Sequence, residues 1–357
     1  MKSRRSKHNI KRLQRISPKL LKAMGVVILL IVVYVFGYPF VYSHFAKVND
    51  LASSQAHIIS RDPSLRKVLV VTETKNNDVE AVFYALYNRD NNEGVLIYLP
   101  AEVYLPSADK LGIGSKKVCV RDIKYTAQTY DRNEADFVIN LLGNTLALYP
   151  DSYIILTVPE GRSVDRIAWV DTLSQIGKYK KMHLTGDVAE IQIRASNLKL
   201  NEIEAVRDEL LLVDWNDRNI IDVSTEAFSQ ETANVLGESI RVADLHEIDD
   251  SILHWRERLL PADVKREHGR VEVYNASDVS GLGGFYARLV RNSCCDVLRV
   301  GNADGDFKGI RAYVVDPERY ANTVRYLQNS IGVDLEVING RPDFMTTGDV
   351  VLIVGDV

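Results

Sequence analysis

A stretch without any charged residue, from Ala23 to Ala46, constrains this chain more than any other feature of its sequence. Its central part, Gly25 to Tyr42, consists mainly of Val, Ile, Leu, Tyr and Phe. Roughly 20 such residues in a helix cross the hydrocarbon core of a bilayer. The sequence therefore predicts a transmembrane helix over residues 23–45.

Basic residues fill the segment before this span. The first 22 residues contain nine Lys or Arg residues and no acidic residue. Such segments stay on the cytoplasmic side of a membrane. We therefore interpret residues 1–22 as a cytoplasmic tail of a single-pass protein in the cell membrane, with its later domains extracytoplasmic. A cleaved signal peptide is the alternative, but the apolar run is long and no small-x-small cleavage site follows it directly.

Individual residues of the predicted span fit particular depths of a bilayer. Gly25 and Leu29 lie in its first turns. Tyr34 and Tyr42 suit an interfacial aromatic belt, and Pro39 is expected to kink the helix near its outer end. These five residues are the predicted membrane anchor, whose partner is the lipid bilayer.

Apolar residues recur every three or four positions directly after the span. The set is Phe45, Val48, Ala52, Ala56 and Ile59. This spacing predicts that the helix continues outward as an amphipathic stalk over residues 46–66. Asp62 and Pro63 are expected to end it.

The composition beyond the tail restricts the possible partners and sites. Nine of the 44 basic residues lie in the tail, which leaves 35 against 48 acidic residues, a net charge of −13 with His neutral. An acidic surface disfavours nucleic acid. Cys119, Cys294 and Cys295 make no disulfide framework, and no Cys/His cluster has metal-ligand spacing. We therefore expect no disulfide, no cofactor and no nucleic-acid partner.

Strands and helices alternate in the sequence from residue 67 to residue 245. Strands are predicted at 67–71, 79–87, 94–99, 153–158 and 220–223. Helices are predicted at 134–146, 164–176 and 201–213, where apolar residues recur every three to four positions. This order predicts an α/β sandwich around a mixed sheet. A helix at 249–260, broken by Pro261, and the charged stretch 263–270 indicate a linker over residues 246–269.

Residues 270–357 read as a second, small α/β domain of βαββαβ type. Its strands are predicted at 271–274, 296–300, 310–315, 335–338 and 350–354. One helix follows the glycine-rich turn at 281–284. The other has Asp316 as N-cap and Gly332 as its stop, with Leu327 on its apolar face.

Five segments of this last domain match a known pattern. They are Val271–Ser277 (VEVYNAS), Ser280–Gly284 (SGLGG), Val300–Asp304 (VGNAD), Arg311–Val315 (RAYVV) and Gly348–Asp356 (GDVVLIVGD). Through them the domain resembles the LytR C-terminal domain, which commonly follows the LytR-CpsA-Psr catalytic domain. Members of that family transfer glycopolymers from polyprenyl-pyrophosphate lipids to the bacterial cell wall, so the resemblance implies a function in cell-wall biogenesis.

The acids of the middle region follow this family's pattern only in part. The strand Lys67–Lys75 looks like the family's first strand, but the Gly and Asp that normally follow fall on Thr72 and Thr74. The carboxylate is therefore lost or displaced to Glu73. The family's next acid corresponds to Glu80, or to Asp78 with a longer loop.

The arginines depart further from the family's pattern. The family's Ser-Ile-Pro-Arg-Asp motif is represented by Tyr98–Glu102, so that its Arg becomes Ala101 and its Asp becomes Glu102. Of the later arginine segment, only Arg194 stands nearby. Alanine cannot contact a pyrophosphate as an arginine does.

Two functions follow from this partial match. Phosphoryl transfer needs arginines and a divalent metal to offset the phosphate charge, so we interpret the chain as a noncatalytic, degenerate relative that binds or scaffolds. Its partner is then a cell-wall polymer or an envelope protein. The alternative is an active phosphotransferase, in which Asp78, Glu80 and Glu102 hold Mg²⁺ and Arg121, Arg162 or Arg194 supply positive charge.

Overall fold

The computed structural model describes residues 18–32, 48–76, 78–106, 117–159, 191–233, 237–305, 307–331 and 335–356, and residues 164, 166, 169 and 172 singly. Met1–Ala46 and Lys47–Val357 are separate units, and each is described by itself. Most of the helix predicted at 164–176 lies outside the described residues.

The first unit contributes one helix, α1 (Pro18–Val32). Its large apolar side chains from Met24 to Val32 are 44% to 62% exposed. Within the part of the chain that the structure describes, no helix combines the length and the apolar character needed to cross a membrane. Gly25 and Leu29 lie in α1, whereas Tyr34, Pro39 and Tyr42 lie outside the described residues. The span at 23–45 therefore stays a prediction.

The predicted stalk helix is wrong over the residues that are described. Residues 48–64 form no helix. The backbone N–H groups of Leu51 and Ala52 donate to the Tyr153 hydroxyl at 3.0 and 3.1 Å, and that of Ser53 donates to Asp136 at 2.7 Å. These partners bind the backbone of the segment to Tyr153 and Asp136, and its apolar residues Ala52, Ala56 and Ile59 pack against the core without a helix.

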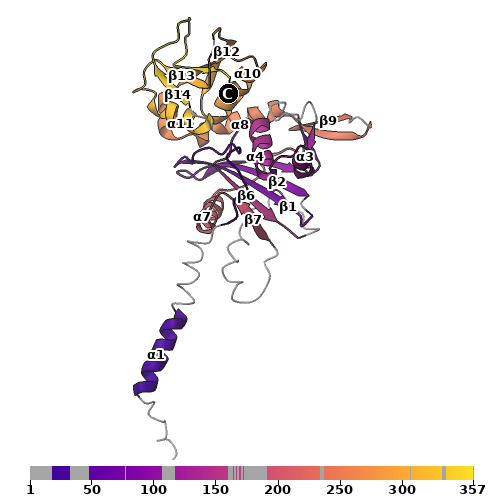
Figure 1. Ribbon diagram of the computed structural model, residues 1–357, viewed down its shortest axis with the longest axis vertical. Coiled ribbons are helices and arrows are strands. Elements are labelled where there is room, and N and C mark those ends of the chain that lie inside the picture. The colour runs from indigo at the N-terminus through magenta and orange to yellow at the C-terminus, as the bar shows by residue number, and fades with distance from the viewer. Residues whose placement is uncertain are drawn as a thin grey trace, which may run out of the picture. The chain divides into compact units, whose positions relative to one another are not determined.

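A six-stranded mixed sheet forms the centre of the middle region (Figure 1). A mixed sheet was predicted here, but its edge strand Gln192–Ser196 was not. Its order is β7-β6-β1-β2-β3-β8. The strands are β1 (Leu65–Glu73), β2 (Val79–Asn88), β3 (Glu93–Pro100), β6 (Ser152–Thr157), β7 (Gln192–Ser196) and β8 (Ile220–Asp222). β1 pairs in parallel with β6, and β3 with β8, while the other neighbours are antiparallel.

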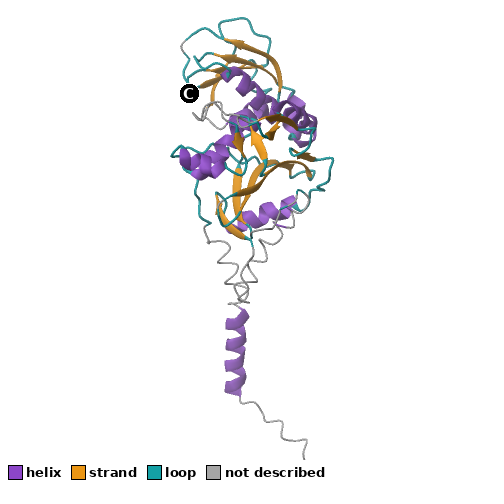
Figure 2. Ribbon diagram, turned by 90° about the vertical axis from the view of Figure 1, so that its right-hand side faces the viewer, coloured by secondary structure: helices purple, strands orange, loops and turns teal. Residues whose placement is uncertain are grey.

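Helices cover both faces of this sheet, which is why all nine residues of β1 are buried (Figure 2). α4 (Glu134–Leu146) and α8 (Leu245–Leu259) pack on one face. α7 (Leu200–Leu210) packs on the other through Ile203, Val206 and Leu210. Asn133 caps α4 by accepting from the Asp136 N–H at 3.1 Å, so the predicted 134–146 helix is confirmed.

A second, four-stranded sheet was not predicted. Its order is β5-β4-β10-β9. The strands are β4 (Val103–Leu105), β5 (Val118–Cys119), β9 (Ser229–Ala233) and β10 (Ser239–Ala243). β4 and β5 are too short to show alternation, and β9 reads Ser-Gln-Glu-Thr-Ala. The helix α3 (Ile123–Thr129) follows β5 and was also missed, because its seven residues are too few to show a helical repeat of apolar positions.

The last region contains the five predicted strands in one mixed sheet of order β12-β11-β15-β13-β14. Its elements are β11 (Arg270–Asn275), α10 (Leu282–Ser293), β12 (Asp296–Asn302), β13 (Ile310–Val314), α11 (Ala321–Ile331), β14 (Leu335–Asn339) and β15 (Val350–Val354). β15 is central, pairing in parallel with β11 and antiparallel with β13.

The start of α11 differs from the prediction. The helix begins at Ala321, and Asp316 instead shapes the preceding turn by accepting from the Arg319 N–H at 3.1 Å. The cap comes from Glu267, whose carboxylate accepts from the Asn322 and Thr323 N–H groups at 2.9 and 2.6 Å. Glu267 ends α9 (Ala262–Glu267), far from α11 in sequence, so local spacing gave no sign of it.

The stretch predicted as a linker, 246–269, lies within α8 and α9 and the turn beyond them. Arg288 of α10 binds Asp249 of α8 at 2.6 Å, and the Asn292 amide donates to the Leu146 carbonyl at 3.0 Å. Lys67 of β1 donates to Ser330 of α11 at 3.3 Å. One hydrophobic core runs through these elements.

The cysteines also differ from the prediction. Cys294 and Cys295 are joined by a disulfide, whereas we expected none. α10 ends at Ser293, and Cys294 leaves helical geometry with φ −151°. The turn between α10 and β12 thus lets two neighbouring side chains meet. Cys119 is a free thiol.

Candidate functional site

One edge of the six-stranded sheet brings together the ends of several strands. β1, β3, β6 and β8 run in the same direction, so their carboxyl ends lie at this edge together with the amino end of β7. Open α/β sheets commonly bind ligands beyond the carboxyl ends of their strands. This edge is therefore the candidate site.

Four charged side chains form a cluster at this edge, which we call the ion cluster: Glu73, Lys124, Arg194 and Glu134. The Glu73 and Lys124 side chains are 1% and 2% exposed and form an ion pair. Arg194 Nη1 lies 3.2 Å from both carboxylate oxygens of Glu73. Arg194 Nη2 lies 3.0 Å from Glu134 Oε2. The two cations and two carboxylates thus form one continuous chain of contacts.

Each member of the ion cluster comes from a different element. Glu73 ends β1 at an irregularity in its pairing with β2, and Lys124 lies in the first turn of α3. Arg194 lies in β7, and Glu134 opens α4. A carboxylate at a helix N-terminus is favoured by the helix dipole. Gln128 also donates to Glu134 Oε1 at 2.8 Å.

Burial and neighbouring groups shift the pKa values of two members of the ion cluster, Lys124 and Glu134. Burial, reinforced by the nearby positive charge of Arg194, lowers the pKa of Lys124 to about 8. Burial opposes ionisation of Glu134, but hydrogen bonds from Gln128 and Arg194 lower its pKa overall. Two positive groups therefore face two negative ones. A phosphate arriving here meets cations that already have carboxylate partners.

The three predicted metal-ligand acids make none of the side-chain contacts that join the ion cluster. Asp78 and Glu102 are exposed, and Glu80 is half-buried. Among the described residues, no group of three or more His, Cys, Asp or Glu side chains is placed to hold a metal ion. The displaced carboxylate Glu73 is used as the partner of two cations instead.

Three arginines were predicted to supply positive charge. Of these, Arg194 joins the ion cluster, as just described. Arg121 is exposed, and its backbone N–H donates to the Ala101 carbonyl at 3.0 Å. Arg162 lies outside the described residues. Ala101 itself is 7% exposed, so the position where the family has an arginine is enclosed here.

Sequence reasoning missed Lys124 and Glu134. Lys124 shares the buried side of α3 with Ile123 and Ala127, and a lysine among apolar helix positions is the only local sign of its role. It also missed a second pair at the same edge, in which Arg166 Nη1 lies 2.7 Å from Asp222 Oδ2 at the end of β8. The Glu73–Lys124 pair and the Arg166–Asp222 pair each join residues distant in sequence.

The chain has low similarity to known proteins. No family model and no curated protein matches it. Similar solved structures include the Lin1025 protein from Listeria innocua, with 11% identity and a TM-score of 0.36 over 55% of this chain and 98% of that one. TagV from B. subtilis has 9% identity and a TM-score of 0.35, over 56% of this chain and 100% of that one. The structure of TagT bound to LI-WTA has 11% identity and a TM-score of 0.38, over 60% of this chain and 99% of that one. TM-scores of this size decide neither family nor function.

Proposed function

We propose that this protein is a membrane-anchored, extracytoplasmic protein of the bacterial cell envelope that binds a cell-wall polymer or an envelope protein without catalysing transfer. The observation that carries the proposal is the ion cluster, in which Lys124 and Arg194 are each paired with carboxylates. The motifs of residues 270–357, which resemble the LytR C-terminal domain, support the cell-wall setting.

The charge balance supports a noncatalytic role. Transfer from a lipid pyrophosphate develops negative charge that arginines and a metal ion must offset. Glu73 forms ion pairs with both Lys124 and Arg194. If a phosphate replaces Glu73 in these pairs, the buried carboxylate is left without a partner, which costs about 3–5 kcal/mol. Among the described residues, Asp78, Glu80 and Glu102 belong to no group of three or more side chains that could hold a metal ion.

The test is a turnover assay with residues 47–357, a polyprenyl-pyrophosphate-linked glycopolymer and Mg²⁺ or Mn²⁺. We expect no transfer or hydrolysis by the wild type. Glu102→Gln and the cluster variant Glu73→Gln are measured in parallel. Metal-dependent turnover by the wild type that either variant abolishes would establish the alternative, an active glycopolymer phosphotransferase.

Binding is tested with the same protein. We expect it to sediment with isolated cell-wall material, or to bind purified envelope proteins, at neutral pH. Walls stripped of their anionic glycopolymer serve as the control for the polymer itself. Failure to bind either kind of partner would contradict the binding function.

The location is proposed from the basic tail and the uncharged span of residues 23–45. A reporter that is active only outside the cytoplasm, fused after Val357, is expected to be active. A reporter active only inside the cytoplasm serves as its counterpart. Activity of the second reporter alone would contradict the proposed orientation.

A further inference from the structure

The Cys294–Cys295 disulfide contributes little to the stability of the fold. A disulfide stabilises mainly by closing a loop in the unfolded chain, and the effect grows with loop length. These two residues are adjacent in sequence, so the bond closes no loop between distant parts of the chain. A gain in stability therefore does not explain this bond, whereas a role in thiol chemistry would.

The disulfide lies against a small cavity open to solvent. The space open to water there is about 30 Å³. Both cysteines line it, together with residues of α8, α9 and the start of β12, among them Glu257, Lys265 and His268. Each cysteine is 4% exposed. The space is the size of about two water molecules, so a thiol reaches the sulfur atoms from this side only when the side chains that line the cavity move aside.

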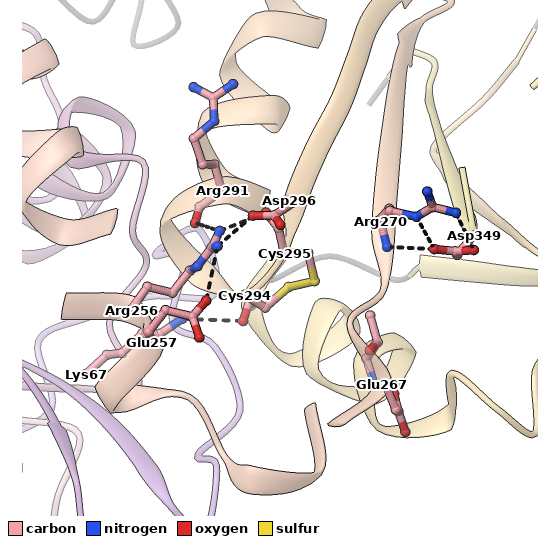
Figure 3. The surroundings of a disulfide bond; sticks show 12 residues. Lys67, Arg256, Glu257, Glu267, Arg270, Arg291, Cys294, Cys295, Asp296 and Asp349 are labelled. Atoms are coloured by element: carbon pink, nitrogen blue, oxygen red, sulfur yellow. Dashed lines mark hydrogen bonds and ion pairs between the residues drawn. A yellow bond between two sulfur atoms is a disulfide. The ribbon is translucent and has the colours of Figure 1, made fainter. Parts of the chain in front are cut away.

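Arg256 fixes the backbone around the disulfide, as Figure 3 shows. Its guanidinium is almost buried, donating to the Cys295 and Arg291 carbonyls at 3.1 and 3.3 Å. It also binds the Asp296 carboxylate at 2.6 Å and Glu257 at 3.6 Å. The acids that line the cavity are therefore paired with Arg256. Lys265 and His268 add basic groups to the same lining, and positive charge stabilises a leaving thiolate.

We propose that Cys294 and Cys295 form a thiol–disulfide exchange site whose substrate is a thiol or a disulfide reaching it through this cavity. A thiolate attacks one cysteine sulfur and forms a mixed disulfide, while the other cysteine leaves as a thiolate and takes up a proton. A second thiol then breaks the mixed disulfide, releasing the external disulfide and the second cysteine thiol. Two electrons pass from the thiols to the protein, and an external disulfide reverses both steps.

The experiment uses the whole unit 47–357 with Cys119→Ser, so that every label reports on the pair. The folded protein is equilibrated with reduced or oxidised glutathione, or with dithiothreitol, then unfolded in acid and alkylated. We expect no label after oxidised glutathione and two labels after dithiothreitol, with an unchanged circular dichroism spectrum. Two labels after oxidised glutathione would show that the bond does not form. Reduction only after prior unfolding would show a closed bond that does not exchange.

A matched pair of variants tests the cavity as the route. Lys265 lines it, whereas its neighbour Arg266 is exposed and pairs with Asp263, and Lys265→Ala and Arg266→Ala each remove one positive charge. We expect Lys265→Ala to slow reduction by glutathione, an anionic thiol, by roughly threefold or more, and Arg266→Ala by under about twofold. Equal rates for the two variants would overturn the proposed route.

Discussion

Glu73 and Lys124 show how this fold accommodates buried charge. Sequence reasoning named Glu73 as the position of a carboxylate that is either lost or displaced, and Arg194 as the arginine nearest to the family's later segment. It did not predict that they bind each other. Lys124 and Arg194 are 51 and 121 residues from Glu73 along the chain. Pairs at such distances follow from strand order and direction, which neither periodicity nor spacing reveals.

Lys67 gives a prediction at the same scale. Burial lowers its pKa to about 8, although Asp151 and Asp62 act in the opposite direction. The folded state therefore holds the Lys67 proton less tightly than the unfolded state. Below about pH 8 Lys67 is protonated in both states, and burying its positive charge lowers the free energy of unfolding by the full amount. The penalty is relieved as the pH rises from about 8 towards the unfolded value of 10.5.

Lys67→Met removes this charge while keeping the length of the side chain. We expect it to raise the free energy of unfolding at pH 7 by about 1–3 kcal/mol, since each pKa unit corresponds to about 1.4 kcal/mol. The gain should shrink between pH 8 and pH 10 in urea unfolding. Lys75→Met, at an exposed position, is the control and should show no such trend. A gain that does not depend on pH would contradict this account of Lys67.

The secondary-structure elements divide into those that the sequence predicts and those that it does not. All five strands of the last region and helix α4 were predicted, because their apolar residues form a clear pattern or their caps are local. The four-stranded sheet was missed because β4 and β5 contain only three and two residues, and because β9 is polar and β10 has a single buried residue. The cap of α11 was misplaced because Glu267 reaches it through the fold rather than through the neighbouring sequence.

Helix α11 also provides a test of its packed face. Leu327, predicted on the apolar face, is fully buried with 0% exposure, and Val324 and Ile331 are buried on the same helix. Leu327→Ala should lower the free energy of unfolding by about 2–5 kcal/mol, because it leaves a cavity. Arg325→Ala, on the exposed side of the same helix, should change it by less than about 0.5 kcal/mol. Chemical denaturation measures both, and similar losses for the two would contradict the assigned face.

The whole unit from Lys47 to Val357 is joined by contacts that cross the expected boundary near residue 270. α8 carries buried Ile248 and Ile252 into the shared core, and its Arg256 holds the turn before β12. Motifs predicted the order of the regions along the chain. They did not predict this docking, since it depends on side chains such as Asn292 that bind a backbone carbonyl of another region.

Two fragments measure how far the last region folds alone. Residues 264–357 contain complete strand and turn signals, so we expect cooperative thermal unfolding. Residues 244–357 add α8, whose N-cap is Asp244, and should unfold at a higher temperature because Arg256 regains its partners Cys295 and Asp296. The absence of a cooperative transition in the shorter fragment would contradict its autonomy. Equal midpoints would show that α8 adds no stability.

The central position of β15 has a consequence for biosynthesis. β11 with β12 forms one half of the last sheet and β13 with β14 the other, and β15 alone lies between them. A ribosome releases this strand after the other four, so the two halves cannot join until β15 has emerged. Assembly must wait for a long-range pairing, and such pairings are slow to form. Until then both inner strand edges remain open to other extended segments, so a chaperone that shields them until β15 pairs would favour correct assembly.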